Sequence, residues 1–343
     1  MKIAVDAMGG DYAPELVING AVAAVKEYNL EVILVGDKPI IEKLLAKNKY
    51  TGNRIQVIHT TEIIEMHEPA ALSVRRKRDS SIVRAMELVK EKKADAFFSA
   101  GNTGAVACAA TLSLRLLPGI ERPGIAIVVP NLKGISLVID VGANIDPKPA
   151  HLFQYGVMAQ VYSKYILHKN NPSIGLLNIG EEEGKGTDFM KEAHALFSKS
   201  ELNFIGNVEG KDLFSGKCDC IVCDGFVGNV ALKVSESLAE TMMVFLKREI
   251  MSNFIGKIGA MLLRQSFKRF KKKVDYTEYG GAPLLGVDGI VMIGHGRSNA
   301  KAIKNAIRFA AEEVERNVND KILEEMNLLR SAAESSPEKV SNG

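Results

Sequence analysis

Short apolar runs alternate along this chain with longer segments in which apolar positions recur every three or four residues. The short runs are typical of buried β-strands, and the longer segments, such as residues 15–28, 40–47 and 80–92, are typical of amphipathic helices. Strands are predicted at residues 2–7, 31–36, 54–60, 96–101, 124–130, 136–144, 173–180, 204–210, 218–225 and 289–296. This alternation predicts an α/β fold with a largely parallel sheet flanked by helices.

Glycine and a polar residue stand at the end of nearly every predicted strand. The loops read "DAMGGD", "SAGNTGA", "DVGAN", "NIGEEEGKG", "CDGFVGN" and "GHGRSNA". Glycine lets backbone amides approach an anion closely, and a following helix N-terminus adds partial positive charge. Because ligands of such sheets bind beyond the carboxyl ends of the strands, the loops together predict one site that suits phosphate. For any single loop, a glycine that only turns the chain is the alternative.

The first loop does not fit a dinucleotide site, because "AMGGDYAPE" lacks the G-x-G-x-x-G spacing that such a site needs after its first strand. Asp6 and Asp11 flank Gly9 and Gly10 in this loop. Carboxylates in these positions orient loop amides or bind a hydroxyl group or an ion, or they only cap and turn the chain.

Two cations stand beside these loops. Arg75 opens the run "RRKRDSS" ahead of an amphipathic helix, and Lys185 lies in the glycine-rich loop "GEEEGKG". Arginine binds phosphate through two parallel hydrogen bonds, and lysine binds it as a point charge. The alternatives are a solvated basic turn around Arg75 and a lysine held by the neighbouring glutamates.

Asn229 and His295 stand where strands give way to helices. An asparagine amide can donate to a developing oxyanion, and a histidine can move a proton, although lone histidines often serve only the structure. The chain has no G-x-S-x-G elbow, so a covalent serine mechanism has little support.

Charge and cysteine content exclude several classes of protein. A formal net charge of +3 is too small for a general affinity for nucleic acid. Cys218, Cys220 and Cys223 lie within a predicted buried strand, and no second group of Cys or His lies nearby. We therefore interpret them as buried thiols rather than metal ligands.

Residues 245–273 differ in character from the rest of the chain. Apolar residues recur at helical spacing, interrupted by glycines, and the segment ends in a run of Lys and Arg without an acid. Such a helix is typical of one that lies on anionic lipid, or of one that packs on a second subunit with its basic end on an acidic protein. The residues expected to enter the membrane are Phe254, Ile258, Met261 and Leu262.

The expected domain organisation is one α/β catalytic domain over residues 1–330, or two lobes of it, with residues 245–273 protruding and residues 331–343 forming a disordered tail. No apolar run approaches the roughly 20 residues of a membrane-spanning helix. The N-terminus has no signal-like segment, so a cytoplasmic location is expected.

The ordered set of motifs resembles one family, the phosphate acyltransferases of bacterial phospholipid synthesis. The resemblance runs from "DAMGGDYAP" to "GGAPLLGVDG" and "HGRSNA" and covers almost the whole chain. The family makes acyl-phosphate from long-chain acyl-[acyl-carrier protein] and inorganic phosphate. It implies a fold similar to isopropylmalate dehydrogenase and phosphotransacetylase, a homodimer, no nicotinamide or other cofactor, and no obligatory metal.

The resemblance further implies peripheral attachment to the inner face of the cytoplasmic membrane, with a downstream glycerol-3-phosphate acyltransferase as a possible partner. Chemistry suggests the roles of single residues. Lys185 and Arg75 would hold phosphate, Asn102 and Asn229 would stabilise the oxyanion, and Asp224 and His295 would position loops or protonate the thiol. The expected catalytic residues are Lys185, Asn229, Asp224, His295 and Asn102. The expected substrate-binding residues are Asp6, Gly9, Gly10, Asp11, Arg75, Gly101, Thr103, Asn144 and Gly228.

Two other functions fit parts of the pattern. A nicotinamide-dependent hydroxy-acid dehydrogenase of the related fold would need an adenosine pocket and usually a cluster of aspartates. A membrane-bound partner of the carrier protein without its own chemistry would leave the polar glycine loops unexplained.

Overall fold

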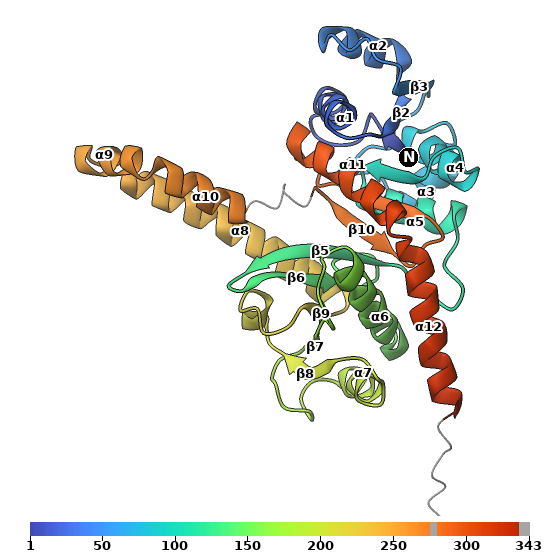
Figure 1. Ribbon diagram of the computed structural model, residues 1–343, viewed down its shortest axis with the longest axis vertical. Coiled ribbons are helices and arrows are strands. Elements are labelled where there is room, and N and C mark those ends of the chain that lie inside the picture. The colour runs from blue at the N-terminus through green and yellow to red at the C-terminus, as the bar shows by residue number, and fades with distance from the viewer. Residues whose placement is uncertain (275–279, 336–343) are drawn as a thin grey trace, which may run out of the picture.

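A computed structural model describes residues 1–274 and 280–335 and places eleven strands in one continuous sheet (Figure 1). The strand order across the sheet is β3-β2-β1-β4-β11-β10-β5-β6-β9-β7-β8. The strands are β1 (Lys2–Asp6), β2 (Glu31–Gly36), β3 (Ile55–His59), β4 (Ala96–Ser99), β5 (Gly124–Asn131), β6 (Gly134–Ile139), β7 (Ile174–Leu177), β8 (Phe204–Val208), β9 (Cys220–Val222), β10 (Ala282–Leu285) and β11 (Ile290–Ile293).

Strand direction reverses near the middle of the sheet. Strands β1 to β4 and β11 are parallel to one another, and so are β6 to β9 in the other half. Between the halves, β11, β10, β5 and β6 pair antiparallel in succession. Three reversals leave the second half running opposite to the first. The register nevertheless brings the carboxyl ends of the two halves to nearly the same level, because Ser99 at the end of β4 is level with Ala282 of β10, and Ile139 at the end of β6 pairs with Ala126 of β5, about one residue further along. The expected largely parallel sheet is confirmed, with this reversal added.

Helices cover both faces of the sheet. They are α1 (Glu15–Glu27), α2 (Lys38–Lys47), α3 (Ala70–Arg76), α4 (Ser81–Lys90), α5 (Thr103–Ser113), α6 (Pro149–Tyr165), α7 (Asp188–Ser198), α11 (Ala300–Glu315) and α12 (Val318–Ser335). On β4, Phe97 packs in a cluster with α4 and α5, whereas Phe98 packs in another with α1 and α11. Successive strand residues face opposite sides, so β4 is buried on both faces, as a parallel sheet requires.

Polar side chains cap the N-termini of many of these helices. The side chains of Asp37, Ser80 and Asn299 accept hydrogen bonds from backbone amides in the first turns of α2, α4 and α11. Capping of this kind satisfies amides that have no partner within the helix.

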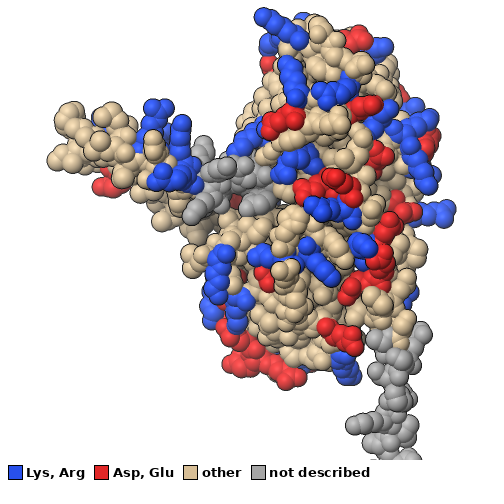
Figure 2. All heavy atoms as spheres, in the orientation of Figure 1, with Lys and Arg blue, Asp and Glu red and all other residues tan. Residues whose placement is uncertain are grey.

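A helical projection leaves the body of the molecule between β9 and β10 (Figure 1). It consists of α8 (Gly225–Ile250), α9 (Phe254–Leu262) and α10 (Arg264–Val274). Over the 26 residues of α8, only Gly225 and Gly228 at its base are buried. In Figure 2 the outer end of the projection is largely uncharged, and Lys and Arg side chains gather further in.

The observed boundaries differ from the expected ones in three places. The projection starts at the base of α8 rather than at residue 245, because α8 runs without a break from Gly225 to Ile250. Helix α12 extends to Ser335, so residues 331–335 of the expected tail are helical, and the remainder of the tail lies outside the described residues. Strand β10 was not expected, because Pro283 and its glycine neighbours are typical of turns.

Candidate active site

Three loops meet at the carboxyl ends of β1, β4 and β11. The amide of Asp11 donates to the carbonyl oxygen of Gly296 at 2.8 Å. A Cβ atom on Gly9 would lie 2.7 Å from the amide nitrogen of Gly101, so the first two loops touch backbone to backbone. We call Asp6, Gly9, Gly10, Asp11, Gly101, Asn102, Thr103 and His295 the first cluster.

The side chain of Asp6 fixes the backbone of this cluster through hydrogen bonds. Its buried carboxylate accepts hydrogen bonds from the hydroxyl of Ser99 at 2.7 Å and from the amide of Met8 at 3.0 Å. Burial raises the pKa of Asp6, and the hydrogen bonds from Ser81, Ser99 and the loop amides oppose that rise. The carboxylate thus orients loop amides, which was one of the two readings of this aspartate.

The side chain of Asn102 is hydrogen-bonded to the backbone of two segments. Its side-chain oxygen caps α5 by accepting from the amide of Ala105. Its nitrogen lies 3.0 to 3.2 Å from the carbonyl oxygens of Glu65, Met66 and Glu68. Both hydrogens of the amide are therefore engaged in this structure, which supports a positioning role, and the oxyanion role of Asn102 stays a prediction.

Thr103 and Arg75 lie on the outer side of the first cluster. Thr103 is the exposed first residue of α5. Helix α3 packs against this turn, since a Cβ on Gly104 would lie 3.1 Å from the Cβ of Ala70. The charge of Arg75 reaches Cys108 on α5, where it opposes the rise in pKa that burial causes. Arg75 is therefore exposed beside the cluster, and among residues 1–274 and 280–335 its side chain has no acidic partner.

A second cluster forms at the carboxyl ends of β6 and β9 around the buried carboxylate of Asp140. This carboxylate accepts backbone hydrogen bonds of 2.7 to 3.1 Å from Ile125, Gly142, Ala143 and Asn144. Burial raises its pKa, and these amides oppose the rise. Asp140 therefore orients the backbone amides of the "DVGAN" loop, as Asp6 orients those of the "DAMGGD" loop.

Asn144, Asp224, Gly228 and Asn229 belong to this second cluster. Asp224 caps α8 by accepting from the amides of Phe226 and Val227. A Cβ on Gly228 would lie 1.9 Å from the carbonyl oxygen of Asp140, so only glycine fits there. The Asn229 side chain lies beside Gly142, because a Cβ on that glycine would be 3.7 Å from it. Asn144 donates to the Pro123 carbonyl and to the Tyr155 hydroxyl, so its amide supports the loop.

Lys185 lies in the loop between β7 and α7. Its carbonyl oxygen accepts from the side chain of Asn178 at 3.0 Å, and its side chain packs beside Gly180. Strands β6, β9 and β7 are neighbours that point the same way, so the loop that carries Lys185 leaves the sheet on the same side as the second cluster, with the end of β7 roughly 10 Å from the end of β6.

The structure therefore divides the expected site residues between the two halves of the sheet. His295 and the amides of Gly9, Gly10 and Gly101 follow strands of the first half, and Asn229, Asp224 and Lys185 follow strands of the second. Sequence reasoning missed the two residues that organise these loops, Ser99 and Asp140. Each stands at or just after the last residue of an apolar run, which is the signal that pointed to Asp6.

Metal binding has no support in the described parts of the chain, where no group of three or more His, Cys, Asp and Glu side chains is placed to share an ion. Cys218, Cys220 and Cys223 are buried at β9, and burial raises the pKa of Cys218 and of Cys220 to about 12. The expectation that these three thiols are buried is confirmed.

Proteins of similar sequence indicate the family to which this chain belongs. Residues 1–321 match a family model described as "Fatty acid synthesis protein". A phosphate acyltransferase from Dictyoglomus turgidum is 53% identical over 329 residues, which cover 95% of this chain and 98% of that protein. A phosphate acyltransferase from Geobacter sulfurreducens is 49% identical over 326 residues, with 95% and 94% covered.

Solved structures show the same fold. A phosphotransacetylase from Streptococcus pyogenes superposes with a TM-score of 0.63 at 18% identity and covers 92% of this chain and 94% of its own. A branched-chain phosphotransacylase from Enterococcus faecalis has a TM-score of 0.56 at 17% identity, with 92% and 99% covered. Together with the sequence matches over nearly the whole chain, these findings show that the protein belongs to the phosphate acyltransferase family of fatty acid and phospholipid synthesis.

Proposed function

We propose that this enzyme transfers a long-chain fatty acyl group from acyl-[acyl-carrier protein] to inorganic phosphate and releases acyl-phosphate. The observation that carries the proposal is the identity of about half of all residues with phosphate acyltransferases over 95% of the chain. The amides that Asp6 and Asp140 hold in glycine loops support it, because an oxyanion and a phosphate both need fixed donors. Neither the dehydrogenase nor the scaffold alternative accounts for both observations.

The reaction does not require a strong general base. Phosphate is already an anionic nucleophile at neutral pH, and a thiolate is a good leaving group, so positioning and charge stabilisation should dominate the rate. In this mechanism the amides near Gly9 and Gly10 and the cations Arg75 and Lys185 hold phosphate. Asn229 donates to the thioester oxygen as it becomes anionic, and His295 protonates the departing thiol.

The reaction is tested by incubating the purified protein with palmitoyl-[acyl-carrier protein], with and without inorganic phosphate, and following thioester loss and acyl-phosphate by mass spectrometry. Phosphate-dependent acyl-phosphate is the expected product. Binding of the carrier protein without turnover would support the scaffold instead, and binding of a nicotinamide cofactor in a titration would support the dehydrogenase.

Asn229→Ala measures the oxyanion role. Loss of one such donor costs about 2.7 to 4 kcal/mol of barrier, or a 10² to 10³-fold fall in kcat.

Lys185→Met should raise the phosphate KM instead, with Lys191→Met on the exposed side of α7 as the matched control. Unchanged kinetics in a folded Lys185 variant would remove that residue from the mechanism.

We further propose that the projection binds the surface of the cytoplasmic membrane from inside the cell. Phe254, Met261 and Leu262 of α9 expose between 68% and 76% of their surface, and Ile258 exposes 40%. Arg264, Lys268 and Arg269 follow in α10 and suit anionic headgroups. Helices long and apolar enough to cross a bilayer are absent from the described residues.

Liposome flotation tests this surface. The double variant Phe254→Asp, Met261→Asp should no longer float with vesicles that contain anionic lipid, because two charges oppose insertion of the α9 face. Leu328→Asp, on an equally exposed position of α12, is the control that should still float. Flotation of the double variant would place the contact elsewhere. Addition of the downstream glycerol-3-phosphate acyltransferase to the vesicles would show whether it contributes.

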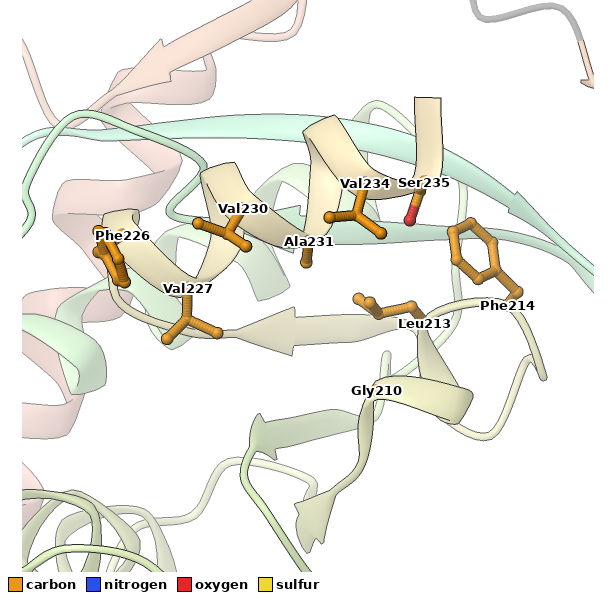
Figure 3. A pocket seen from close by; sticks show the side chains of 9 residues that line it. All are labelled: Gly210, Leu213, Phe214, Phe226, Val227, Val230, Ala231, Val234 and Ser235. Atoms are coloured by element: carbon orange, nitrogen blue, oxygen red, sulfur yellow. The ribbon is translucent and has the colours of Figure 1, made fainter. Parts of the chain in front are cut away.

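We also propose that two copies associate through the base of α8. An apolar face of this helix is exposed over its whole length and comprises Val227, Val230, Val234, Leu238, Met242 and Phe245. At its base the face borders a groove of about 370 Å³ beside η1 (Gly210–Leu213), which Leu213 and Phe214 line together with Val230 and Val234 of α8 (Figure 3). A stripe of this length on a folded protein is typical of a helix that packs on a partner. Val230→Asp with Val234→Asp should yield monomers in analytical ultracentrifugation.

A further inference from the structure

The segment that leads into α3 forms part of the rim of the first cluster. The side chain of Asn102 donates to three backbone carbonyl oxygens of residues 65–68. In the loop after β11, a Cβ on Gly296 would lie 3.2 Å from the Cε of Met66. Helix α3 begins directly after this segment, so its side chains stand at the entrance of the cluster.

One face of α3 is exposed and combines an apolar side chain with a basic one. Leu72 and Arg76 stand at i and i+4 in this helix, so they lie beside each other on the same face. Leu72 exposes 46% of its surface, and Arg76 is exposed as well. Ser73 and Val74 are buried and attach α3 to the body of the protein, which leaves the face with Leu72 and Arg76 available to another molecule.

The positive charges at this place are not neutralised within the described residues. The nearest acids along the chain, Glu68 and Asp79, each pair with a different cation. Within residues 1–274 and 280–335, no carboxylate lies at ion-pair distance from Arg75, Arg76 or Arg78. Exposed charges of one sign attract a molecule that carries the opposite sign. We call Leu72, Arg76 and Arg78 the α3 surface.

The α3 surface is near enough to the first cluster for a bound protein to deliver a substrate. A Cβ on Gly104, in the first turn of α5, would lie 3.1 Å from the Cβ of Ala70. From Ala70 the helix rises about 9 Å to Arg76. In the proposed reaction the acyl thioester arrives attached to a protein, and that protein must stand at the entrance while the thioester reaches inside.

We infer that the α3 surface docks the acyl carrier protein through acidic side chains of that protein. Arg76 and Arg78 attract the carrier, and Leu72 supplies an apolar contact beside them. Arg75, whose charge reaches Cys108 on α5, remains the proposed ligand of phosphate. This inference deepens the proposed function and rests on it, because the proposed substrate identifies the protein that must dock.

Charge reversal tests the α3 surface. The variant Arg76→Glu, Arg78→Glu is compared with wild type in the phosphate-dependent assay with palmitoyl-[acyl-carrier protein]. At low salt its kcat/KM for the carrier substrate should fall about 10-fold or more, because the substitutions turn attraction into repulsion. The KM for the carrier substrate should rise, whereas kcat and the phosphate KM should stay unchanged. Added salt should narrow the difference from wild type, since it screens exposed charges.

The matched control is Arg115→Glu, Arg316→Glu, which makes the same change of charge at two other exposed arginines. Arg115 follows the end of α5 and Arg316 follows the end of α11. Both helices run back from the carboxyl ends of their strands, so these arginines lie at the end of the sheet away from the first cluster. The control should keep wild-type kinetics at every salt concentration.

The apolar part of the surface is tested separately. Leu72→Ser should raise the KM for the carrier substrate and leave its salt dependence unchanged, because the substitution removes apolar contact but no charge. Leu112→Ser, at a 50% exposed position of α5, is its control and should have no effect.

Two results would overturn the inference. If Arg76→Glu, Arg78→Glu behaves like the control, the α3 surface does not contact the carrier protein. If its phosphate KM rises and its KM for the carrier substrate does not, the two arginines bind phosphate. The milder variant Arg76→Gln, Arg78→Gln removes the charges without reversing them and should give an intermediate loss, which keeps the test valid if the first variant does not fold.

Failure of the inference is distinguishable from failure of the proposed function. The wild-type enzyme alone decides the latter, because it either makes acyl-phosphate from phosphate and palmitoyl-[acyl-carrier protein] or does not. Binding of fluorescently labelled carrier protein, followed by anisotropy, decides the docking surface without any turnover. Wild type and the Arg115, Arg316 control should bind with the same Kd, and Arg76→Glu, Arg78→Glu should bind about 10-fold more weakly or worse. Equal binding by all three, or no binding by wild type, would contradict the inference.

Discussion

Glu313 is a buried acid to which we assign no function. Its titration should make the free energy of unfolding of this protein fall as the pH rises. The side chain lies inside the contact of α11 with α6 and accepts a hydrogen bond from the Tyr162 hydroxyl at 3.1 Å. Burial raises its pKa from 4.5 to about 8. Between these two pH values the folded chain keeps a proton that the unfolded chain releases, so unfolding becomes progressively easier.

The size of the effect follows from that shift. Each pH unit between 4.5 and 8 costs about 1.4 kcal/mol, which gives an upper limit of about 5 kcal/mol above pH 8. Relaxation and water entry around a buried charge reduce such costs, so we expect about 2 to 3 kcal/mol. Glu313→Gln keeps the shape and the acceptor for Tyr162 but cannot ionise. Urea unfolding should therefore show the variant more stable than wild type at pH 9 and nearly equal at pH 5.

Two results would refute this reasoning. A difference between Glu313→Gln and wild type that is the same at pH 5 and pH 9 would mean that the carboxyl does not titrate between those values in the folded protein. A variant less stable than wild type at pH 9 would mean that the charged carboxylate is stabilised by its surroundings. Glu315→Gln, on an exposed position of the same helix, is the control and should show neither effect.

Two further predictions follow from close contacts in the structure. Gly228→Ala should lower the free energy of unfolding by about 1 to 3 kcal/mol in thermal denaturation, since its Cβ meets the backbone of Asp140, whereas Gly259→Ala in α9, where a Cβ meets nothing within 4 Å, should be neutral or raise it. Glu68 pairs with Lys77, and hydrogen bonds from Lys77 and Ser73 lower its pKa to about 2. Wild type should therefore exceed Glu68→Gln in stability above pH 4.5, and urea titrations should show that advantage vanish as the pH falls towards 2.

The amino-acid sequence was sufficient to predict the strands of the fold, but not the direction in which they run relative to one another. Periodicity located ten of the eleven strands, because each is a short apolar run bounded by glycine or a polar residue. The reversal through β10 and β5 was not predictable, since antiparallel and parallel partners of a buried strand have the same composition. Strand β10 itself was not predicted, because Pro283 and Gly286 are typical of turns.

The candidate site was predicted as a set of loops but not as an arrangement. Glycine at strand ends pointed to Gly9, Gly10, Gly101 and Gly228, and the structure places all of them in close backbone contacts. Which side chains face a ligand depended on hydrogen bonds between distant segments, such as those that engage Asn102 with residues 65–68. Sequence spacing carries no information on such partners.

The four cysteines of this chain differ in a way that matters for labelling. Alkylating reagents attack the thiolate. Burial raises the pKa of Cys218 and of Cys220 to about 12, and it also raises the pKa of Cys223 well above its usual value. Cys108 is only half buried, on the outer side of α5 and within reach of the charge of Arg75. Maleimide dyes should therefore modify Cys108 first, which offers a fluorescence reporter of substrate binding without any engineered cysteine.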